Sequence, residues 1–264
     1  MESLTVSAFE QPAHWDDAAL QYERTAHRFT SLYAEDAAAM VPLGPRSTVL
    51  DVAAGTGALA FVAARKGARV LATDFAPGMV ARIAAAAVPG VEARVMDGQA
   101  LDLPDAHYDA VFSLFGVIMF ADWRKGLAEM ARVTRPGGHG VVGTWADRGA
   151  ATFLLLGEVR RKLFPGRAEM AMPPAIAALS TPEGFVRELR AAGYRSAEVR
   201  RVTHDFALET AALDQPDTLF GMSPDWKDLS AAEQAAVIAE VRRMAAGRPV
   251  LPVPSTALIG LARR

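Results

Sequence analysis

The residues best suited to chemistry in this chain are two glycines followed by two aspartates. Gly55 and Gly57 lie in the segment VLDVAAGTGALA (49–60), where we expect a strand, a turn and then a helix. Glycine at such a turn lets the backbone approach a ligand, and the first N–H groups of the helix point toward it. Asp74 follows Gly57 by 17 residues. Because an acidic residue about 20 positions after a glycine loop binds the ribose of a nucleotide, the pattern predicts a nucleotide-type cofactor site.

The second aspartate ends the next expected strand. Asp97 lies in the segment MDGQ (96–99), where its carboxylate could accept a hydrogen bond from the exocyclic amine of an adenine. Asp74 would accept from two ribose hydroxyls, and we expect the apolar side chains of Phe75 and Met79 to flank the base. Asp51 is expected to accept backbone N–H bonds and so to hold the glycine loop.

A regular alternation of strands and helices carries these residues. The hydrophobic pattern and the breakers predict strands at 48–53, 69–73, 91–96, 108–114 and 139–144, and helices at 57–66, from 77 onward and at 122–134. Strands that alternate with helices over short loops form right-handed crossovers and a parallel sheet. Ligands of such sheets bind beyond the carboxyl ends of the strands, which is where the glycine turn lies.

The segments before and after this alternation have a different hydrophobic pattern. Helical spacing predicts one helix over about 15–40, and the alternation lapses after Trp145. There the pattern predicts helices at 152–164, 182–192, 210–221 and 230–246, a loop around 170–176, and strands at 197–208 and 255–261. We therefore divide the chain into a helical cover (1–45), a cofactor-binding core (46–147) and cap helices with the last two strands (148–264).

The motifs together resemble the class I S-adenosylmethionine-dependent methyltransferases, particularly the branch of the ubiquinone/menaquinone-biosynthesis methyltransferases. The segments that carry the resemblance are VLDVAAGTG (49–57), LATDFAPGM (71–79), VMDGQAL (95–101), YDAVFSLFGVIMFAD (108–122) and EMARVTRPGGHGVV (129–142). The resemblance implies an α/β, Rossmann-like fold. Its sheet has seven mostly parallel strands with an antiparallel last strand, helices cover both faces, and a helical cap lies over the cofactor end.

The resemblance also implies the cofactor, S-adenosylmethionine, with S-adenosylhomocysteine as product. It assigns the glycine loop to the methionine portion, Asp74 to the ribose, Asp97 and its neighbours to the adenine, and the end of strand 108–114 to the surroundings of the sulfonium. The residues expected to bind the cofactor are Tyr22, Asp51, Ala53, Gly55, Thr56, Gly57, Asp74, Phe75, Met79, Asp97, Gly98, Gln99, Ser113 and Phe115.

Two features of the resemblance depend on details of this chain. Ala53 and Ala54 stand where the family commonly has a glycine and a small residue, and we expect alanine to keep an ordinary backbone there. In this family an N-terminal helix often folds over the cofactor, which would place Trp15 and Tyr22 in the cover. We expect Tyr22 to contact the amino-acid end of the cofactor, and a half-buried core tyrosine is the alternative.

The methyl group of a sulfonium is already activated, so the main task of the protein is alignment. The acceptor must lie about 3–3.5 Å from the methyl carbon, in line with the leaving sulfur, and water must be excluded. No residue stands out as a general base, and the weak candidates are His14, His27 and His204. His107 and His139 precede their strands, which places them at the end of the sheet away from the cofactor.

Motifs and residue types that the sequence lacks narrow the range of possible methyl acceptors. The strand 108–114 is followed by no Asp/Asn-Pro-Pro-aromatic motif, and the chain has no cysteine, which excludes a thiolate adduct. No carboxylate cluster suggests a metal, and a net charge of −2 does not favour nucleic acid. Because the covering segments are rich in Leu, Phe, Met and Pro, we expect a small or medium apolar acceptor, such as a polyketide, quinone, terpenoid or lipid-like molecule. Carbon or oxygen methylation is favoured over nitrogen methylation.

Other readings stay open at this point. The glycine spacing also fits an NAD(P)-dependent oxidoreductase, although no tyrosine is followed four positions later by lysine. A non-catalytic S-adenosylmethionine-binding protein, or one that uses the cofactor for decarboxylation, hydroxylation or cyclisation, would share the motifs. We expect a cytoplasmic protein, because no signal peptide and no run of about 18 apolar residues is present. The sequence leaves a homodimer open.

Overall fold

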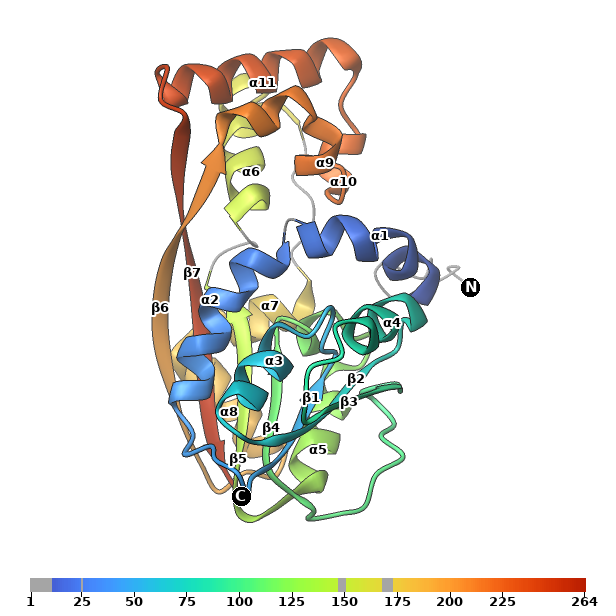
Figure 1. Ribbon diagram of the computed structural model, residues 1–264. Helices are drawn as coiled ribbons and strands as arrows, with labels where there is room; N and C mark the ends of the chain where they lie inside the picture. Colours follow the sequence, from blue (N-terminus) through green and yellow to red (C-terminus); the bar gives the residue numbers. More distant parts are fainter. Residues whose placement is uncertain (1–10, 25, 147–150, 168–172) are drawn as a thin grey trace, which may run out of the picture. The chain divides into compact units, whose positions relative to one another are not determined.

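The computed structural model describes residues 11–24, 26–146, 151–167 and 173–264 (Figure 1). It contains a seven-stranded sheet with the order β3-β2-β1-β4-β5-β7-β6. The strands are β1 (Thr48–Val52), β2 (Arg69–Asp74), β3 (Val91–Val95), β4 (Tyr108–Leu114), β5 (Thr134–Trp145), β6 (Ser196–Glu209) and β7 (Val250–Arg263). The described helices are α1 (Pro12–Arg24), α2 (Ala26–Ala39), α3 (Ala58–Arg65), α4 (Pro77–Ala85), α5 (Trp123–Val133), α6 (Ala151–Leu163), α7 (Pro174–Leu179), α8 (Pro182–Ala191), α9 (Pro216–Phe220), α10 (Pro224–Lys227) and α11 (Ala231–Ala245), with 3-10 turns η2 (Val117–Met119) and η3 (Thr210–Asp214).

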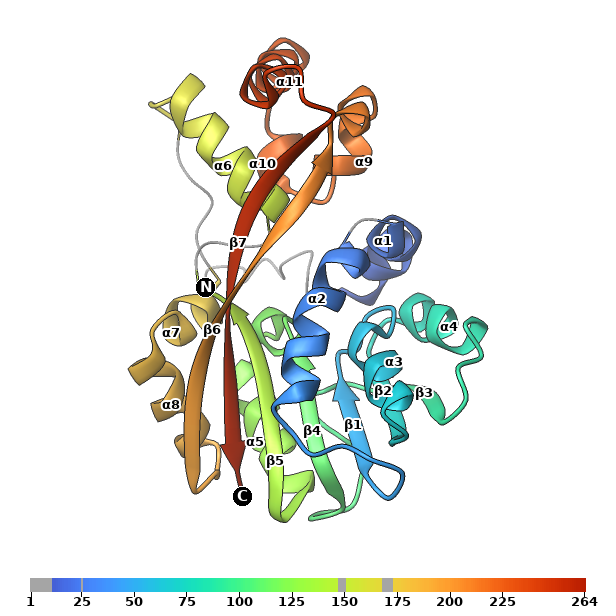
Figure 2. The same cartoon turned by 60° about the vertical axis from the view of Figure 1, so that its left-hand side comes forward.

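The five strands β1 to β5 are parallel, as the alternation predicts. Val52 of β1 pairs with Thr73 of β2, and Asp74 pairs with Val95 of β3, so the carboxyl ends of these strands meet at one edge. Strand β7 runs antiparallel to these strands (Figure 2). Next to the end of β7, the carbonyl of Arg264 accepts a hydrogen bond from the amide of Gly137 in β5 at 2.8 Å. The expected Rossmann-like fold, with its antiparallel last strand, is confirmed.

The described residues form two compact units. The first consists of the described residues within Met1–Thr144, Pro173–Val202 and Ala257–Arg264, and the second of those within Trp145–Met172 and Thr203–Thr256. Strands β6 and β7 therefore contribute to both units. In the first unit α2 and α3 pack on each other, and the sheet buries Leu50 and Phe112 completely. In the second, α6, α9, α10 and α11 enclose the ring pair Phe220–Trp226, with centroids 5.3 Å apart.

Several elements differ from the sequence prediction. The described parts of the expected N-terminal helix are α1 and α2, which lie on either side of residue 25, and α7 lies where we expected a loop. Strand β5 begins at Thr134 rather than at 139, because Thr134 pairs with Tyr108 and a register shift before Ala110 accommodates Pro136 and the following glycines. Within the described residues, no helix is long and apolar enough to cross a bilayer.

Candidate functional site

The glycine loop joins β1 to α3 through three residues in the left-handed region. Gly55 and Gly57 have φ of +56° and +90°, and Ala53 has φ of +54°. A Cβ on Gly57 would lie 2.8 Å from the Phe61 ring, so this position also lacks room for a side chain. The expectation of an ordinary backbone at Ala53 is wrong. The tight turn requires the left-handed conformation there, which strains an alanine by about 1–2 kcal/mol.

Asp51 lies near the end of β1, beneath the loop. Its side chain is almost inaccessible, at 2 % exposure, and its Oδ2 accepts a hydrogen bond from the Ala60 amide of α3 at 3.1 Å. The sequence predicts that Asp51 accepts backbone N–H bonds of the glycine loop, and the donor in the structure lies in the first turn of α3 instead. Burial raises the pKa of Asp51 to about 8, against the effect of the Ala60 bond, and the charge of Asp74 adds to the rise.

Asp74 ends β2 and connects the loop to the start of α4. Its Oδ2 accepts from the Gly55 amide at 2.9 Å and its Oδ1 from the Ala76 amide at 3.0 Å. Burial raises its pKa to about 6, while these backbone bonds act in the opposite direction. Because each carboxylate oxygen has two lone pairs, Asp74 can still accept two hydroxyl donors.

The turn after β3 places Asp97 at the same edge of the sheet. Asp97 is exposed, and its Oδ1 accepts from the Gln99 amide at 2.8 Å and from the Gln99 side chain at 3.1 Å. The side-chain oxygen Oε1 of Gln99 in turn accepts from the backbone amide of Asp122 at 2.7 Å. A Cβ on Gly98 would lie 2.5 Å from the ring of Phe120. This turn is therefore packed tightly against the segment that follows β4.

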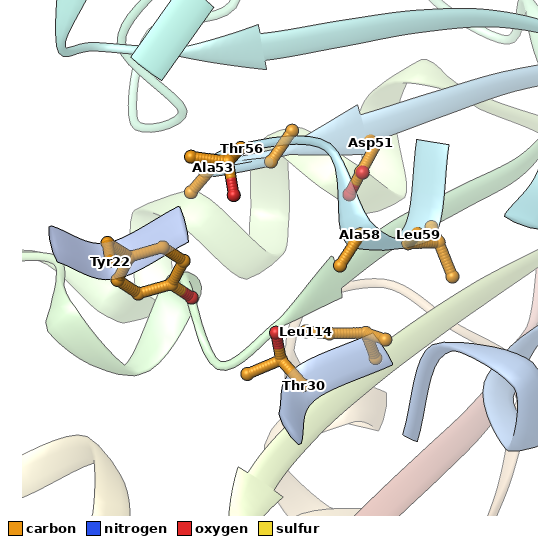
Figure 3. A pocket seen from close by; sticks show the side chains of 9 residues that line it. Tyr22, Thr30, Asp51, Ala53, Thr56, Ala58, Leu59 and Leu114 are labelled. Carbon is orange, nitrogen blue, oxygen red and sulfur yellow. The ribbon is translucent and has the colours of Figure 1, made fainter. Parts of the chain in front are cut away.

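A small cavity of about 20 Å³ opens beside the glycine loop (Figure 3). This volume admits a water-sized group. Its lining consists of Tyr22, Thr30, Asp51, Ala53, Ala54, Thr56, Ala58, Leu59 and Leu114. Tyr22 of α1 and Thr30 of α2 form a hydrogen bond, and burial raises the pKa of Tyr22 to about 12. The walls thus combine hydroxyl groups and one carboxyl group with small apolar side chains.

The two N-terminal helices are tied to the loops by polar contacts. Asp16 of α1 accepts from the Gly78 amide of α4 at 2.5 Å, and His27 Nδ1 of α2 lies 2.7 Å from Thr56 Oγ1 of the glycine loop. An apolar cluster completes the contact between α1 and α4, and its members are Trp15, Ala19, Tyr22, Phe75, Ala76 and Met79. Met79, expected beside the adenine, is fully buried in this cluster.

At the end of β4 the residue that lines the cavity is Leu114, and neither of the expected residues, Ser113 and Phe115, is in the lining. Ser113 is buried and accepts from the Val117 amide at 3.0 Å, while Leu114 lines the cavity. Phe115 follows with φ of +63°, and its ring centroid lies 5.4 Å from that of Tyr33. In the pairing of β1 with β4, Asp51 lies opposite Phe112, and Leu114 lies two residues further on. Because side chains alternate along a strand, Leu114 is on the same face of the sheet as Phe112, and this register could have identified Leu114 as a lining residue.

The weak histidine candidates lie in separate places. Burial lowers the pKa of His27, so the ring is neutral at pH 7 and bonds Thr56. His204 is half-buried in β6 of the second unit, and the side chain of His14 lies outside the described residues. Across the part of the chain that the structure describes, no group of three His, Cys, Asp or Glu side chains could hold a metal ion.

Comparison with known proteins identifies the family. A family model described as a methyltransferase domain matches residues 49–138. A demethylmenaquinone methyltransferase of Mycobacterium sp. (strain KMS) is 36 % identical over 190 residues, which cover 67 % of this chain and 80 % of that protein. This chain is a class I S-adenosylmethionine-dependent methyltransferase. A demethylmenaquinone methyltransferase of Corynebacterium efficiens is 31 % identical over 206 residues, which cover 73 % of this methyltransferase and 88 % of the relative.

A solved structure shows the same fold at low sequence identity. The phosphoethanolamine N-methyltransferase 2 of Haemonchus contortus, solved with phosphomonomethylethanolamine and S-adenosylhomocysteine, superposes with a TM-score of 0.56 at 14 % identity. The match covers 98 % of this methyltransferase and 60 % of that chain.

The residues at the glycine loop suit the cofactor of the family. When bound, S-adenosylmethionine supplies a methyl group on a sulfonium, which makes that methyl electrophilic. Its ammonium group and ribose hydroxyls need buried acceptors, and Asp51 and Asp74 are buried carboxyls beside the loop. At Gly57, where a Cβ would collide with Phe61, no side chain covers the backbone before the start of α3, so a ligand can approach its N–H groups.

Proposed function

We propose that this methyltransferase methylates a carbon or oxygen atom of a small or medium apolar acceptor of the quinone class. The observation that carries the proposal is the long match to demethylmenaquinone methyltransferases, which extends over 190 residues and well beyond the family motifs. A quinol ring is electron-rich and apolar, so it suits a site walled by aromatic and aliphatic side chains.

Aromatic side chains of α2 and of the segment after β4 support an acceptor of this kind. Tyr33 and Phe115 are buried and meet edge to face, and Phe29 extends the same row with its ring 5.3 Å from that of Tyr33. Their rings exclude water from this side of the sheet edge. Phe115 also holds a strained backbone, a feature that concentrates at functional sites.

The polar groups next to that edge are already engaged. Ser113 accepts from the Val117 amide, and Thr56 bonds His27. An acceptor that needs little help in losing its proton suits this arrangement better than an unactivated alcohol. A hydroquinone meets this condition, since its hydroxyl groups are acidic and feed electrons into the ring carbons.

The binding roles follow from the same geometry. We propose that Asp74 receives the ribose hydroxyls, that Asp97, Gly98 and Gln99 border the adenine, and that Tyr22 with the glycine loop borders the amino-acid end. The support for the aspartates and the glycine loop is their common position at the carboxyl ends of β1, β2 and β3, and the support for Tyr22 is its place in the cavity lining beside the loop. The remaining expected cofactor-binding residues, Asp51, Ala53, Phe75, Met79, Ser113 and Phe115, stay predictions, as does a catalytic role for His14, His27 or His204.

The test compares acceptors in one reaction. The protein is incubated with S-adenosylmethionine that carries a deuterated methyl group and with reduced demethylmenaquinone, a phenol or a primary amine, and the products are analysed by mass spectrometry. We expect the quinol to gain the labelled methyl, with loss of one ring or hydroxyl proton to solvent. Methylation of the amine without methylation of the quinol would contradict the proposal. Asp74→Ala serves as the control for enzyme-dependent transfer.

A further inference from the structure

Strand β6 is an edge of the sheet, and its outer side carries backbone groups that no described strand covers. The strand order ends at β6, which has β7 on its inner side (Figure 1). Thr210, next to β6, donates to the carbonyl of Pro249 at 2.9 Å, and the hydroxyl oxygens of Thr203 and Thr256 lie 2.8 Å apart. Because antiparallel bonds alternate along a strand, every second residue from Thr203 to Glu209 turns its N–H and C=O away from β7.

The two sides of the β6–β7 ribbon differ in their capacity to pair with a further strand. In the same register Pro254 lies opposite Asp205 and Pro252 lies opposite Ala207, at positions where the nitrogen of β7 points away from β6. Proline has no N–H, so these two residues keep another strand from adding to that side of β7. Strand β6 contains no proline over Ser196–Glu209. Its outer edge is therefore the side that can add a strand.

Two side chains of opposite charge on this edge have no partner among the described residues. Arg201 and Asp205 are exposed, and neither forms a hydrogen bond or an ion pair within the part of the chain that the structure describes. Arg200, in contrast, pairs with Glu198 of its own strand at 3.1 Å. Arg201 and Asp205 lie two residues before and two residues after Thr203. A second copy of the strand, turned about a two-fold axis at Thr203, would place each arginine opposite an aspartate.

We propose that β6 pairs antiparallel with β6 of a second copy of this chain about Thr203, so that the sheets of two subunits join in a homodimer. Residues 201–205 of each copy form about six backbone hydrogen bonds across the axis. Arg201 of each copy meets Asp205 of the other. These five residues are consecutive in one strand, so the match depends on the strand alone, and it is independent of which acceptor is methylated.

Other registers along the same edge are less favourable. An axis at Asp205 sets the two copies of this carboxylate opposite each other, and an axis at Ala207 sets Asp205 opposite Glu209. Like charges directly opposite each other destabilise a strand pair, whereas opposite charges stabilise it. The charge pattern therefore selects the axis at Thr203.

The strand itself limits how far the pairing extends. The amide of Arg195 bonds the carbonyl of Arg263 at 2.8 Å, so the register of β6 against β7 shifts by one residue between Arg195 and Thr210. Arg200 and Arg201 are consecutive and both exposed, which places the bulge between them. Past the bulge the alternation of outward groups is reversed, so the pairing stops there. A two-fold pair of this kind closes on itself and does not grow into a fibre.

A single cysteine tests the register, because the chain has no cysteine of its own. Thr203→Cys would bring two thiols to the axis, with Cα atoms about 5.5 Å apart, which a disulfide can join. Ala207→Cys, on the same edge, would hold its thiols about 26 Å apart. After mild oxidation, we expect a covalent dimer on non-reducing gels about tenfold faster for Thr203→Cys than for Ala207→Cys. Equal rates, or no covalent dimer of Thr203→Cys, would overturn the register.

Sedimentation of the full wild-type chain tests the dimer without any substitution. Two five-residue segments bury less than the roughly 1,200 Å² of a standard protein interface, so we expect the dimer to dissociate at micromolar concentrations. A series over about 5–200 µM should therefore pass from monomer to dimer. Monomer at every concentration would overturn the proposal.

Charge exchange assigns the interface to its residues. Arg201→Asp and Asp205→Arg should each raise the dissociation constant about tenfold, because like charges then lie opposite each other. The double variant that carries both exchanges should return to within about threefold of the wild type. Arg46→Asp, an exposed site in the turn before β1, is the matched control and should leave the constant unchanged. Thermal unfolding shows that each variant is folded. A dimer that neither single exchange weakens would place the interface elsewhere and overturn the assignment.

Discussion

Buried charge is handled differently at the glycine loop and in the second unit. At the loop, Asp51 and Asp74 are buried among amides and hydroxyls, and their pKa values rise. In the second unit the buried Arg160 forms an ion pair with Asp225, and Glu240 bonds both Lys162 and Arg243, which lowers its pKa to about 2. Removing one member of a pair buried within the chain leaves the other charge without its partner. Carboxyls that are buried without a cation reduce stability at a pH where they are ionised.

The largest expected effect is the pH dependence of stability of the cofactor-free protein. The pKa values of Asp51 and Asp74 are raised in the folded state, so both groups bind protons more tightly there than in the unfolded chain. The contribution of these two groups to stability is therefore full below about pH 4. It falls as the pH rises through about 6 and 8, by on the order of 2–4 kcal/mol between pH 5 and 8. Chemical denaturation at pH 5, 6.5 and 8 measures it.

Asp51→Asn sharpens this first prediction, because the amide keeps the shape without the charge. The variant should lose much of the decline between pH 6.5 and 8 and should exceed the wild type in stability at pH 8. A wild-type free energy of unfolding that rises steadily from pH 5 to 8 would refute the contrast between the two regions.

Breaking the ion pair of the second unit should destabilise the protein by about 3 kcal/mol. Arg160→Met removes the cation and leaves the partly buried carboxylate of Asp225 without its partner. Denaturation of the variant at pH 7 measures the loss. The matched control is Arg200→Met, whose pair with Glu198 is exposed on both sides and should cost little. Equal losses of stability in the two variants would show that burial does not increase the contribution of the Arg160 ion pair.

Asp74→Ala should weaken binding of S-adenosylhomocysteine by about 1.5–3 kcal/mol, which is roughly 10- to 150-fold. The variant loses a charged acceptor and also frees the amides of Gly55 and Ala76, which hold the loop to α4. Equilibrium binding at pH 8 gives the change, with Asp102→Ala as an exposed acidic control. Unchanged affinity would remove Asp74 from the site.

The smallest effect concerns strain in the loop. Ala53→Gly should raise stability by about 0.5–1 kcal/mol, since relief of the left-handed conformation exceeds the added freedom of glycine in the unfolded chain. Ala54→Gly is the matched control next door, because Ala54 does not have a positive φ, and it should lower stability slightly. Thermal unfolding of both variants distinguishes them. A loss in Ala53→Gly as large as that in Ala54→Gly would show that the loop stores no strain at Ala53.

Much of the first unit follows from local patterns. Strand β4 runs over 108–114 as expected, and Thr181 caps α8 through the Gly184 amide as its position before Pro182 suggests. These features depend on residues a few positions apart, so the sequence displays them directly. The helix α7 and the early start of β5 did not follow, because tertiary contacts outweigh local preference at those places.

The sequence by itself determined that β1 to β5 are parallel and which acidic residues lie at the ends of β2 and β3. Only the tertiary structure decided which acid is buried without a cation, that Ala53 takes a left-handed conformation, and that two separated segments, 145–172 and 203–256, form one unit. The reason is physical. Strand and helix periodicity is written in neighbouring residues, whereas desolvation and strain arise from side chains that distant segments bring together.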